Sequence, residues 1–167
     1  MARSLEEIGD GWTLLVLRNA LLGARRFQDF EQTLRIPPNT LSRRLDALVE
    51  HGMLVRRAYE ERPPRDEYEL TAKGLDLAPV LLALSAWGNR WLAPRGEVIV
   101  CADRATGRRV HPVVVDRRTR RELIAGRVAL RAGPGASSAL RKALRKSVPF
   151  GPVPPRGVGR ARLGGEP

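Results

Sequence analysis

The alternation of apolar and polar residues between positions 36 and 54 predicts one amphipathic helix. Four apolar side chains recur at helical spacing and form a single stripe: Leu41, Leu45, Leu48 and Val49. Pro38 suits the first turn, where the N–H that proline lacks would have no partner inside the helix, and Gly52 is typical of a helix end. We therefore expect a helix that begins near Pro38 and stops at Gly52.

The other face of this helix is polar, and its polar residues lie toward the N-terminal end: Asn39, Thr40, Ser42, Arg43 and Arg44. Such a face is either solvated surface or a contact surface for an anionic partner. Asparagine pairs with adenine and arginine with guanine through two hydrogen bonds, whereas serine and threonine bind bases or phosphates. These residue types are those that a nucleic-acid contact uses.

Three further helical patterns precede this helix, at residues 4–9, 12–23 and 25–34. Only the short sequence "RIPP" (35–38) separates the third pattern from the amphipathic helix. Two helices joined by so short a turn are typical of a helix-turn-helix unit.

A β-hairpin is predicted directly after the amphipathic helix, because residues 53–61 and 66–70 are rich in β-forming side chains. Between these two runs lies "RPPR" (62–65), and prolines in a tip cannot pair in a ladder. The tip is therefore stiff and carries Arg62 and Arg65. These arginines either keep the hairpin edge soluble or contact phosphates or a minor groove.

A last helix is predicted over residues 72–92, with Thr71 as its cap. Pro79 should kink or split it. Helices, hairpin and final helix together predict an α+β fold, the winged helix-turn-helix, whose second helix presents its N-terminal residues to base edges. Short α/β units of this kind also occur without DNA.

The charge of the chain agrees with an anionic partner. Its 167 residues carry a formal net charge of +12, which favours nucleic acid, although an acidic membrane surface or simple solubility also fits. The longest apolar stretch, 77–87, is too short to cross a bilayer, and the N-terminus lacks a signal-peptide pattern. We therefore expect a cytoplasmic protein without a membrane partner. No catalytic motif is present, so we expect no enzyme activity.

Several motifs in residues 5–92, taken together, resemble the HxlR-type transcriptional regulators, which are relatives of the MarR winged-helix proteins. They are G-x-W-T-L-L-x-L, R-R-F-x-D-F, N-T-L-S-R-R-L and E-R-P-P-R-x-E-Y-x-L-T-x-K-G. The resemblance implies a homodimer whose two recognition helices, 38–51 here, bind successive half-sites in the major groove. Helix 25–34 would support each recognition helix, and the wings would lie against the backbone or the minor groove.

Combined with the polar face, this likeness gives the candidate site residues. The candidate DNA contacts are Asn39, Thr40, Ser42, Arg43, Arg44, Arg62, Arg65 and Lys73. The candidate dimer interface comprises Leu5, Ile8, Leu84, Trp87 and Trp91. The two tryptophans fit either a dimer interface or a cover over the core of one subunit. Many relatives carry a cysteine just before the shared motif, and some sense thiol-reactive compounds with it. Because this chain begins after that position, we do not expect redox sensing by that route.

Residues 96–132 lie outside the shared core and predict a small antiparallel meander. Two turns of similar sequence, "DRATGRR" (103–109) and "DRRTRRE" (116–122), start thirteen residues apart. Some longer relatives have a ribbon here with cysteines and histidines that looks zinc-binding. In this segment Cys101 and His111 are too few for a structural site of four ligands, so we expect neither a metal nor a cofactor. Cys101 is either a packed strand residue or a reactive thiol.

Composition divides the chain into three segments. Residues 1–93 form the winged helix-turn-helix and dimerisation domain, 94–132 a small β-rich extension, and 133–167 a tail rich in Pro, Gly and Arg. The tail holds seven Lys and Arg against one acid, Glu166, and cannot bury enough apolar surface to order itself, so disorder is expected. Within the tail, residues 138–146 have the pattern of a short helix that needs a partner.

The main hypothesis is a sequence-specific regulator that binds double-stranded DNA as a homodimer on an inverted-repeat operator, and that represses by family habit. The alternative is a winged-helix module whose basic face and tail bind an acidic protein or RNA. A small-molecule effector in the dimer cleft near Trp12, Trp87 and Trp91 would complement the main hypothesis.

Overall fold

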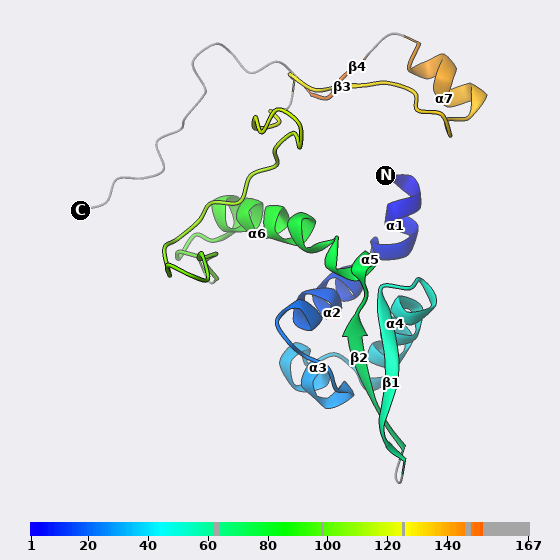
Figure 1. Cartoon of the computed structure of the whole chain (residues 1–167), viewed down its shortest axis with the longest axis vertical. Coiled ribbons are helices and arrows are strands. Elements are labelled where there is room, and N and C mark those ends of the chain that lie inside the picture. Colours follow the sequence, from blue (N-terminus) through cyan, green and yellow to red (C-terminus); the bar gives the residue numbers. More distant parts are fainter. Residues whose placement is uncertain (62–63, 98, 125, 146–147, 152–167) are drawn as a thin grey trace. The chain divides into compact units, whose positions relative to one another are not determined.

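The computed structural model describes residues 1–61, 64–97, 99–124, 126–145 and 148–151. Its internal contacts divide the chain into two compact units, Met1–Pro112 and Val113–Pro167. The colours of Figure 1 follow the chain through both units. The boundary between them falls inside the predicted extension 94–132 rather than at one of its ends.

The first unit contains the predicted succession of helices and strands (Figure 1). Its elements are α1 (Ala2–Ile8), α2 (Gly11–Leu21), α3 (Phe27–Leu34), α4 (Pro38–Glu50), β1 (Leu54–Glu61), β2 (Pro64–Leu70), α5 (Ala72–Leu75) and α6 (Ala78–Leu92). This order confirms the predicted α+β winged helix-turn-helix. The amphipathic helix of the sequence is α4, and the hairpin β1–β2 is the wing.

The helical segment after the hairpin is split into α5 and α6, as Pro79 predicts. Pro79 lies in the first turn of α6, where its missing N–H breaks no helical hydrogen bond. The Thr71 hydroxyl caps α5 by accepting a hydrogen bond from the N–H of Gly74 at 3.2 Å, and it donates one to the carbonyl of Gly52 at 2.7 Å. The cap therefore also ties α5 to the loop that ends α4.

The core of the first unit lies where α2, α3, α4 and the hairpin meet. Six large side chains are fully buried in it: Leu17, Phe30, Leu41, Leu45, Leu48 and Leu54. Tyr68 of β2 packs edge-on against Phe30 with 6.4 Å between the ring centroids, an arrangement that aromatic pairs favour. The predicted apolar stripe of α4 is thus its buried face, and Val49 lies half-buried at the edge of that face.

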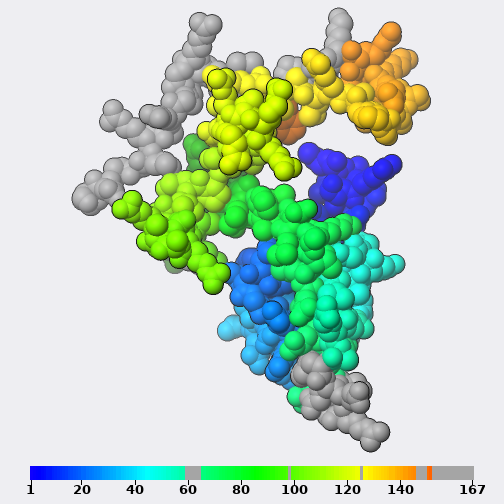
Figure 2. Space-filling view, in the orientation of Figure 1, coloured from blue at the N-terminus to red at the C-terminus, as the bar shows by residue number. Residues whose placement is uncertain are grey.

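The wing is an antiparallel pair in which Leu54 lies opposite Leu70 and Arg57 opposite Glu67. In Figure 1 its two strands run beyond the helices of the first unit, and Figure 2 shows the blue, cyan and green segments of this unit packed against one another. One detail of the prediction is wrong: Pro64 does not lie in the tip but begins β2, opposite Glu61. Proline is tolerated at the first residue of a strand, because few ladder bonds are required there.

The C-terminal extension pairs its backbone in antiparallel fashion, but not as one three-stranded meander. The two turns are each closed by a single bridge, Ala102 with Arg109 and Val115 with Glu122. The strand expected after them is β3 (Ala129–Leu130), and its partner is β4 (Val148–Pro149) from the predicted tail. The apolar runs of this segment are short, residues 98–102 before the first turn and 113–115 before the second, and Pro112 cannot donate to a ladder.

The part of the predicted tail that the structure describes contains regular structure. Helix α7 (Ser138–Ala143) is capped by Ser137, whose hydroxyl accepts a hydrogen bond from the N–H of Leu140 at 3.2 Å. It lies where the sequence pattern places a short helix. Residues 152–167, to which the prediction of disorder also applies, lie outside the described residues.

Replacing Gly74 by alanine should destabilise the first unit, although alanine is the better helix former. A Cβ at this position would collide with the carbonyl oxygen of Met53 and lie 2.9 Å from Cδ2 of Leu70. We expect Gly74→Ala to lower the free energy of unfolding in urea by about 1–3 kcal/mol, as overpacking does. Gly11→Ala is the control, because nothing lies within 4 Å of its Cβ position. Equal stability of the two variants would contradict the close approach of α5 to Met53.

Candidate nucleic-acid interface

The turn between α3 and α4 fixes how α4 is presented. Arg35 adopts a left-handed backbone conformation with φ of 49°, and its N–H donates to the carbonyl of Glu31 at 2.9 Å. The next side chain, Ile36, is buried in the core. Pro37 and Pro38 then set the backbone that starts α4. The turn therefore ends α3, and the buried Ile36 anchors the segment before α4 to the core.

Several predicted contact residues at the N-terminal end of α4 are accessible to solvent. Asn39, Ser42 and Arg43 are exposed and Thr40 is half-buried. Within the described residues, the Arg43 side chain forms neither an ion pair nor a hydrogen bond. Its guanidinium is therefore available to a partner outside the chain.

Arg44 is placed differently from Arg43. It is half-buried, and its Nε lies 3.2 Å from Oδ1 of Asp10. Asp10 caps α2 by accepting a hydrogen bond from the N–H of Thr13 at 3.1 Å. Burial raises the pKa of Asp10, but hydrogen bonds from Thr13 and the charge of Arg44 outweigh it and hold the pKa below its usual range. Arg44 therefore links α4 to the start of α2.

One side of α4 is linked to the wing by a chain of polar contacts. The Ser42 hydroxyl donates to Oδ2 of Asp46 at 3.5 Å, and Asp46 forms an ion pair with Arg56 of β1. Arg56 also lies 3.7 Å from Oδ2 of Asp66 and 5.5 Å from the ring centroid of Tyr68. The sequence offers no signal for the contacts of Arg56, because its partners Asp46, Asp66 and Tyr68 lie ten or more positions away.

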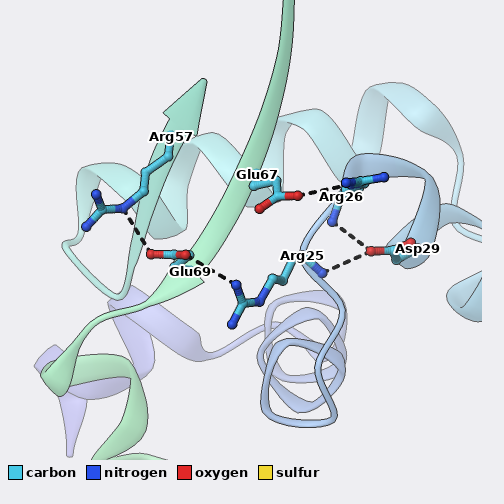
Figure 3. A network of polar contacts seen from close by, with 6 residues as sticks. All are labelled: Arg25, Arg26, Asp29, Arg57, Glu67 and Glu69. Atoms are coloured by element: carbon cyan, nitrogen blue, oxygen red, sulfur yellow. Dashed lines mark hydrogen bonds and ion pairs between the residues drawn. The ribbon is translucent and has the colours of Figure 1, made fainter. Parts of the chain in front are cut away.

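A second network joins the wing to the loop before α3 (Figure 3). The N–H groups of Arg25 and Arg26 donate to Oδ2 of Asp29 at 3.1 and 2.8 Å. The Arg26 side chain also lies 3.0 Å from Glu67 of β2. The N–H of Tyr68 donates to the carbonyl of Arg25 at 2.8 Å. Residues 25 and 26 thus extend the sheet beside β2.

Glu69 completes this network by bridging two arginines. Its Oε1 lies 3.4 Å from Nη1 of Arg25, and its Oε2 lies 2.9 Å from Nε of Arg57 (Figure 3). The sequence presents Glu67 and Glu69 only as charges on a sheet surface, without partners. One part of the network could have been predicted from the sequence. Asp29 is the third residue of α3, and an acidic side chain at that position commonly accepts hydrogen bonds from the N–H groups that precede the helix.

The remaining predicted DNA contacts are Arg62, Arg65 and Lys73. Arg65 is exposed near the tip of the wing, in register with Glu60. Arg62 lies outside the described residues. Lys73 donates to Oε2 of Glu7 at 2.6 Å and to the carbonyl of His51 at 2.8 Å, so it holds α5 to α1 and to the C-terminal end of α4. The structure does not bring Lys73 together with Asn39 and Arg43.

The predicted dimer residues form open apolar surface on α1 and α6. Leu5 and Leu84 are exposed, Trp87 and Trp91 are 54% and 64% exposed, and Ile8 packs half-buried against the core. The two tryptophans therefore do not cover the core of their own subunit. Trp12, at the start of α2, is also partly exposed.

The described residues show no metal-binding cluster, since no three His, Cys, Asp or Glu side chains gather there. Cys101 is a half-buried free thiol. In the same described ranges, no helix is both long and apolar enough to span a bilayer. A pocket of about 310 Å³ lies beside α1 and α5 and is lined by Ile8, Met53 and Leu77 together with charged groups. None of the three tryptophans proposed to line an effector cleft belongs to this pocket.

The chain is similar in sequence to a known protein family and to individual transcriptional regulators. Residues 7–96 match the HxlR-like helix-turn-helix family. Over 141 residues the chain is 38% identical to the uncharacterized HTH-type transcriptional regulator Rv3095 of Mycobacterium tuberculosis. This match covers 84% of this chain and 89% of that protein.

Solved structures show the same fold. The candidate transcription factor PA1374 of Pseudomonas aeruginosa is 44% identical with a TM-score of 0.63, and the match covers 86% of this chain and 98% of that one. PA1607, another candidate transcription factor, is 36% identical with a TM-score of 0.70, and the match covers 80% of this chain and 92% of that one. Matches this long extend past residue 96 into the C-terminal extension.

Asp29 should contribute stability that disappears in acid. Hydrogen bonds from the N–H of Arg26 and then of Arg25 hold the pKa of Asp29 below its usual range. The contribution is fully present above the unfolded-state pKa of about 4 and is lost as the pH falls through the lower folded-state value. Because the side chain is exposed, we expect Asp29→Ala to cost about 0.5–1 kcal/mol at pH 7. Urea unfolding at several pH values should show this difference shrinking below pH 4, and a pH-independent difference would contradict the assignment.

Proposed function

The chain belongs to the HxlR-like helix-turn-helix family of transcriptional regulators, and from that premise we propose that it is a homodimeric repressor of an inverted-repeat operator. The observation that carries the proposal is the exposed Arg43, which has no ion pair among the described residues, on a helix whose leucines Leu41, Leu45 and Leu48 are buried on the opposite face. A recognition helix needs this combination, because its backbone must be held still while its side chains reach base edges. Binding to chromosomal DNA would place the protein in the cytoplasm.

The side chains at the start of α4 have different roles in the proposed recognition of DNA. Arg43 reads a guanine through two hydrogen bonds, and Asn39 is suited in the same way to an adenine. Thr40 and Ser42 add contacts to bases or phosphates. Arg44 acts through its ion pair with Asp10, which holds α4 against α2. Its role in the proposal is therefore positioning.

The wing supplies contacts that do not depend on sequence. Arg65 is exposed near the tip of the hairpin and neutralises a phosphate or enters the minor groove, and Arg62 has the same role in the proposal. The networks through Arg26, Glu67 and Asp46 tie the wing to both helices of the helix-turn-helix. Wing and α4 therefore meet the DNA as one rigid surface.

The dimer is supported by a stripe of apolar side chains on α6. Val80, Leu84, Trp87 and Trp91 recur at helical spacing, and all four are at least 48% exposed. Exposed aromatic residues in such a stripe are typical anchors of a protein interface. Together with Leu5 on α1, the stripe forms the proposed dimer surface, which sets two α4 helices on successive half-sites.

Arg43→Ala should weaken binding to the operator far more than binding to other DNA. We expect a loss of about 1–3 kcal/mol on the intergenic DNA upstream of the protein's own gene, as for one good base contact, and a small loss on scrambled DNA of equal length. Arg95→Ala is the control, because Arg95 is an exposed arginine outside the winged helix. Fluorescence anisotropy titrations with both duplexes give the comparison.

Two outcomes would count against the proposed function. Equal losses on both duplexes for Arg43→Ala would remove the reading role of that residue. A wild-type protein that binds both duplexes with the same affinity at low and high salt would favour the interaction module instead, because a sequence reader keeps a preference when the salt concentration rises.

Trp87→Glu should convert the dimer to a monomer, because a charge would be buried in the apolar interface without a partner. Ser85→Glu adds the same charge to an exposed position outside the apolar stripe and should leave the dimer intact. Sedimentation velocity at micromolar concentration measures both. A wild-type chain that sediments as a monomer would overturn the dimer proposal.

A further inference from the structure

Two turns in the C-terminal extension are built on the same hydrogen-bond scheme. In the first turn, the N–H of Thr106 donates to Oδ1 of Asp103 at 2.8 Å, and the N–H of Gly107 donates to the Asp103 carbonyl at 2.8 Å. The N–H of Asp103 donates in turn to the carbonyl of Arg108 at 2.8 Å. These bonds close a compact tip in the first unit.

The second turn repeats these bonds thirteen residues later, in the second unit. The N–H of Thr119 donates to Oδ1 of Asp116 at 2.6 Å, and the N–H of Arg120 donates to the Asp116 carbonyl at 2.8 Å. The N–H of Asp116 donates to the carbonyl of Arg121 at 2.8 Å. One tip design therefore occurs twice in the chain.

The aspartates of both tips are engaged with their own turns. Hydrogen bonds from the side chain and then the N–H of Thr106 hold the pKa of Asp103 below its usual range. The N–H of Thr119, followed by its hydroxyl, does the same for Asp116. Each carboxylate stays charged and shapes the turn, so it serves as a structural acceptor rather than as a counterion for the arginines.

Of the seven arginines in the turns 103–109 and 116–122, Arg109 forms an ion pair with Glu97, and the other six have no counterion in the described part of the chain. Six exposed arginines of the two turns form neither an ion pair nor a side-chain hydrogen bond there: Arg104, Arg108, Arg117, Arg118, Arg120 and Arg121. By contrast, Arg44, Arg56 and Arg57 of the winged helix each face a carboxylate. The two tips therefore present uncompensated positive charge.

Arg120 occupies a backbone position that favours glycine. Its φ is 57°, and the matching residue of the first tip is Gly107 with φ of 68°. A side chain in this left-handed region costs backbone energy that glycine avoids. Arginine at this position thus adds a positive charge at the expense of local stability, which is an arrangement expected of functional rather than structural residues.

The net positive charge of the chain comes from residues outside the winged helix. Residues 1–93 hold thirteen lysines and arginines and thirteen aspartates and glutamates, so their formal charges cancel. The net charge of +12 therefore comes from residues 94–167, and residues 94–132 hold ten arginines against four acids. General attraction to a polyanion depends on net positive charge, and the recognition domain does not supply it.

We propose that the turns 103–108 and 116–121 each bind backbone phosphates of the DNA duplex, and that these two turns are the sequence-independent DNA contacts of the extension 94–132. The proposal rests on the proposed function, since the same DNA is the partner. The rigid tips hold their guanidinium groups on short turns, and each guanidinium donates to phosphate oxygens in a fixed fork geometry. The extension thus supplies affinity, and α4 supplies sequence preference.

The test compares two double variants of the full chain that lose the same charge. Arg117→Gln with Arg118→Gln changes the second tip. Arg95→Gln with Arg127→Gln changes two exposed arginines of the extension outside the tips. Anisotropy titrations with a scrambled duplex at several salt concentrations give the slope of log K against log salt. We expect the tip variant to lower this slope by about 1–2 per chain, because each phosphate contact contributes about 0.9. The control variant should lower the slope by less than half of that amount.

The same titrations separate this proposal from its rivals. Equal slopes for the tip variant and the control would overturn it, because the charge would then act only as a diffuse field. A loss of affinity for single-stranded RNA without a loss for the duplex would overturn it in favour of RNA. If the wild-type protein does not distinguish its upstream DNA from scrambled DNA, the proposed operator function fails, while the comparison on scrambled DNA still decides the role of the tips.

Arg120→Gly separates binding from folding. Glycine relieves the left-handed strain, so the thermal midpoint of the variant should stay equal or rise. Its affinity for the scrambled duplex should fall, on the order of two- to fivefold at 0.1 M salt, because one phosphate contact is lost. An unchanged affinity in this stably folded variant would show that Arg120 does not contact DNA.

Discussion

The burial of one face of α4 is the constraint on which the rest of the structure depends. Leu41, Leu45 and Leu48 are fully buried together with Phe30 and Leu54 from neighbouring elements. Because these side chains recur at helical spacing, rotating α4 about its axis would expose them, so its orientation is fixed. Once that face is inside, the polar residues near the N-terminal end necessarily face outward. The exposure of these polar residues is therefore a consequence of core packing, and the proposed recognition by α4 depends on it.

Ion pairs between charged side chains connect the elements of the winged helix to one another. Arg26 pairs with Glu67 and Arg56 with Asp46, so the wing is joined to both helices of the helix-turn-helix. Exposed pairs of this kind add little stability individually. Their effect here is geometric, because they fix the wing relative to α4. The formal charges of residues 1–93 cancel, and Arg43 forms no ion pair with any of the described residues.

Specificity and affinity are assigned to different parts of the chain in the two proposals. A recognition domain without net charge has little attraction for arbitrary DNA, so its contacts count mainly where the sequence fits. The arginine tips would add attraction that is the same for every sequence. The likeness to PA1374 and Rv3095 continues past the winged helix into this extension, so the arrangement is open to comparison in proteins with the same layout.

The sequence by itself determined the helices, the split at Pro79, the hairpin and the buried stripe of α4, because periodicity and capping act over a few neighbouring residues. Only the tertiary structure decided which arginines are engaged. Arg44 meets Asp10, which lies far from it in sequence, and Lys73 meets Glu7, so neither is available in the way that Arg43 is. The composition shows thirteen charges of each sign in residues 1–93 but not their pairing. The pairing of charges depends on which surfaces the packing of the core brings together. A local sequence pattern does not predict which surfaces these are.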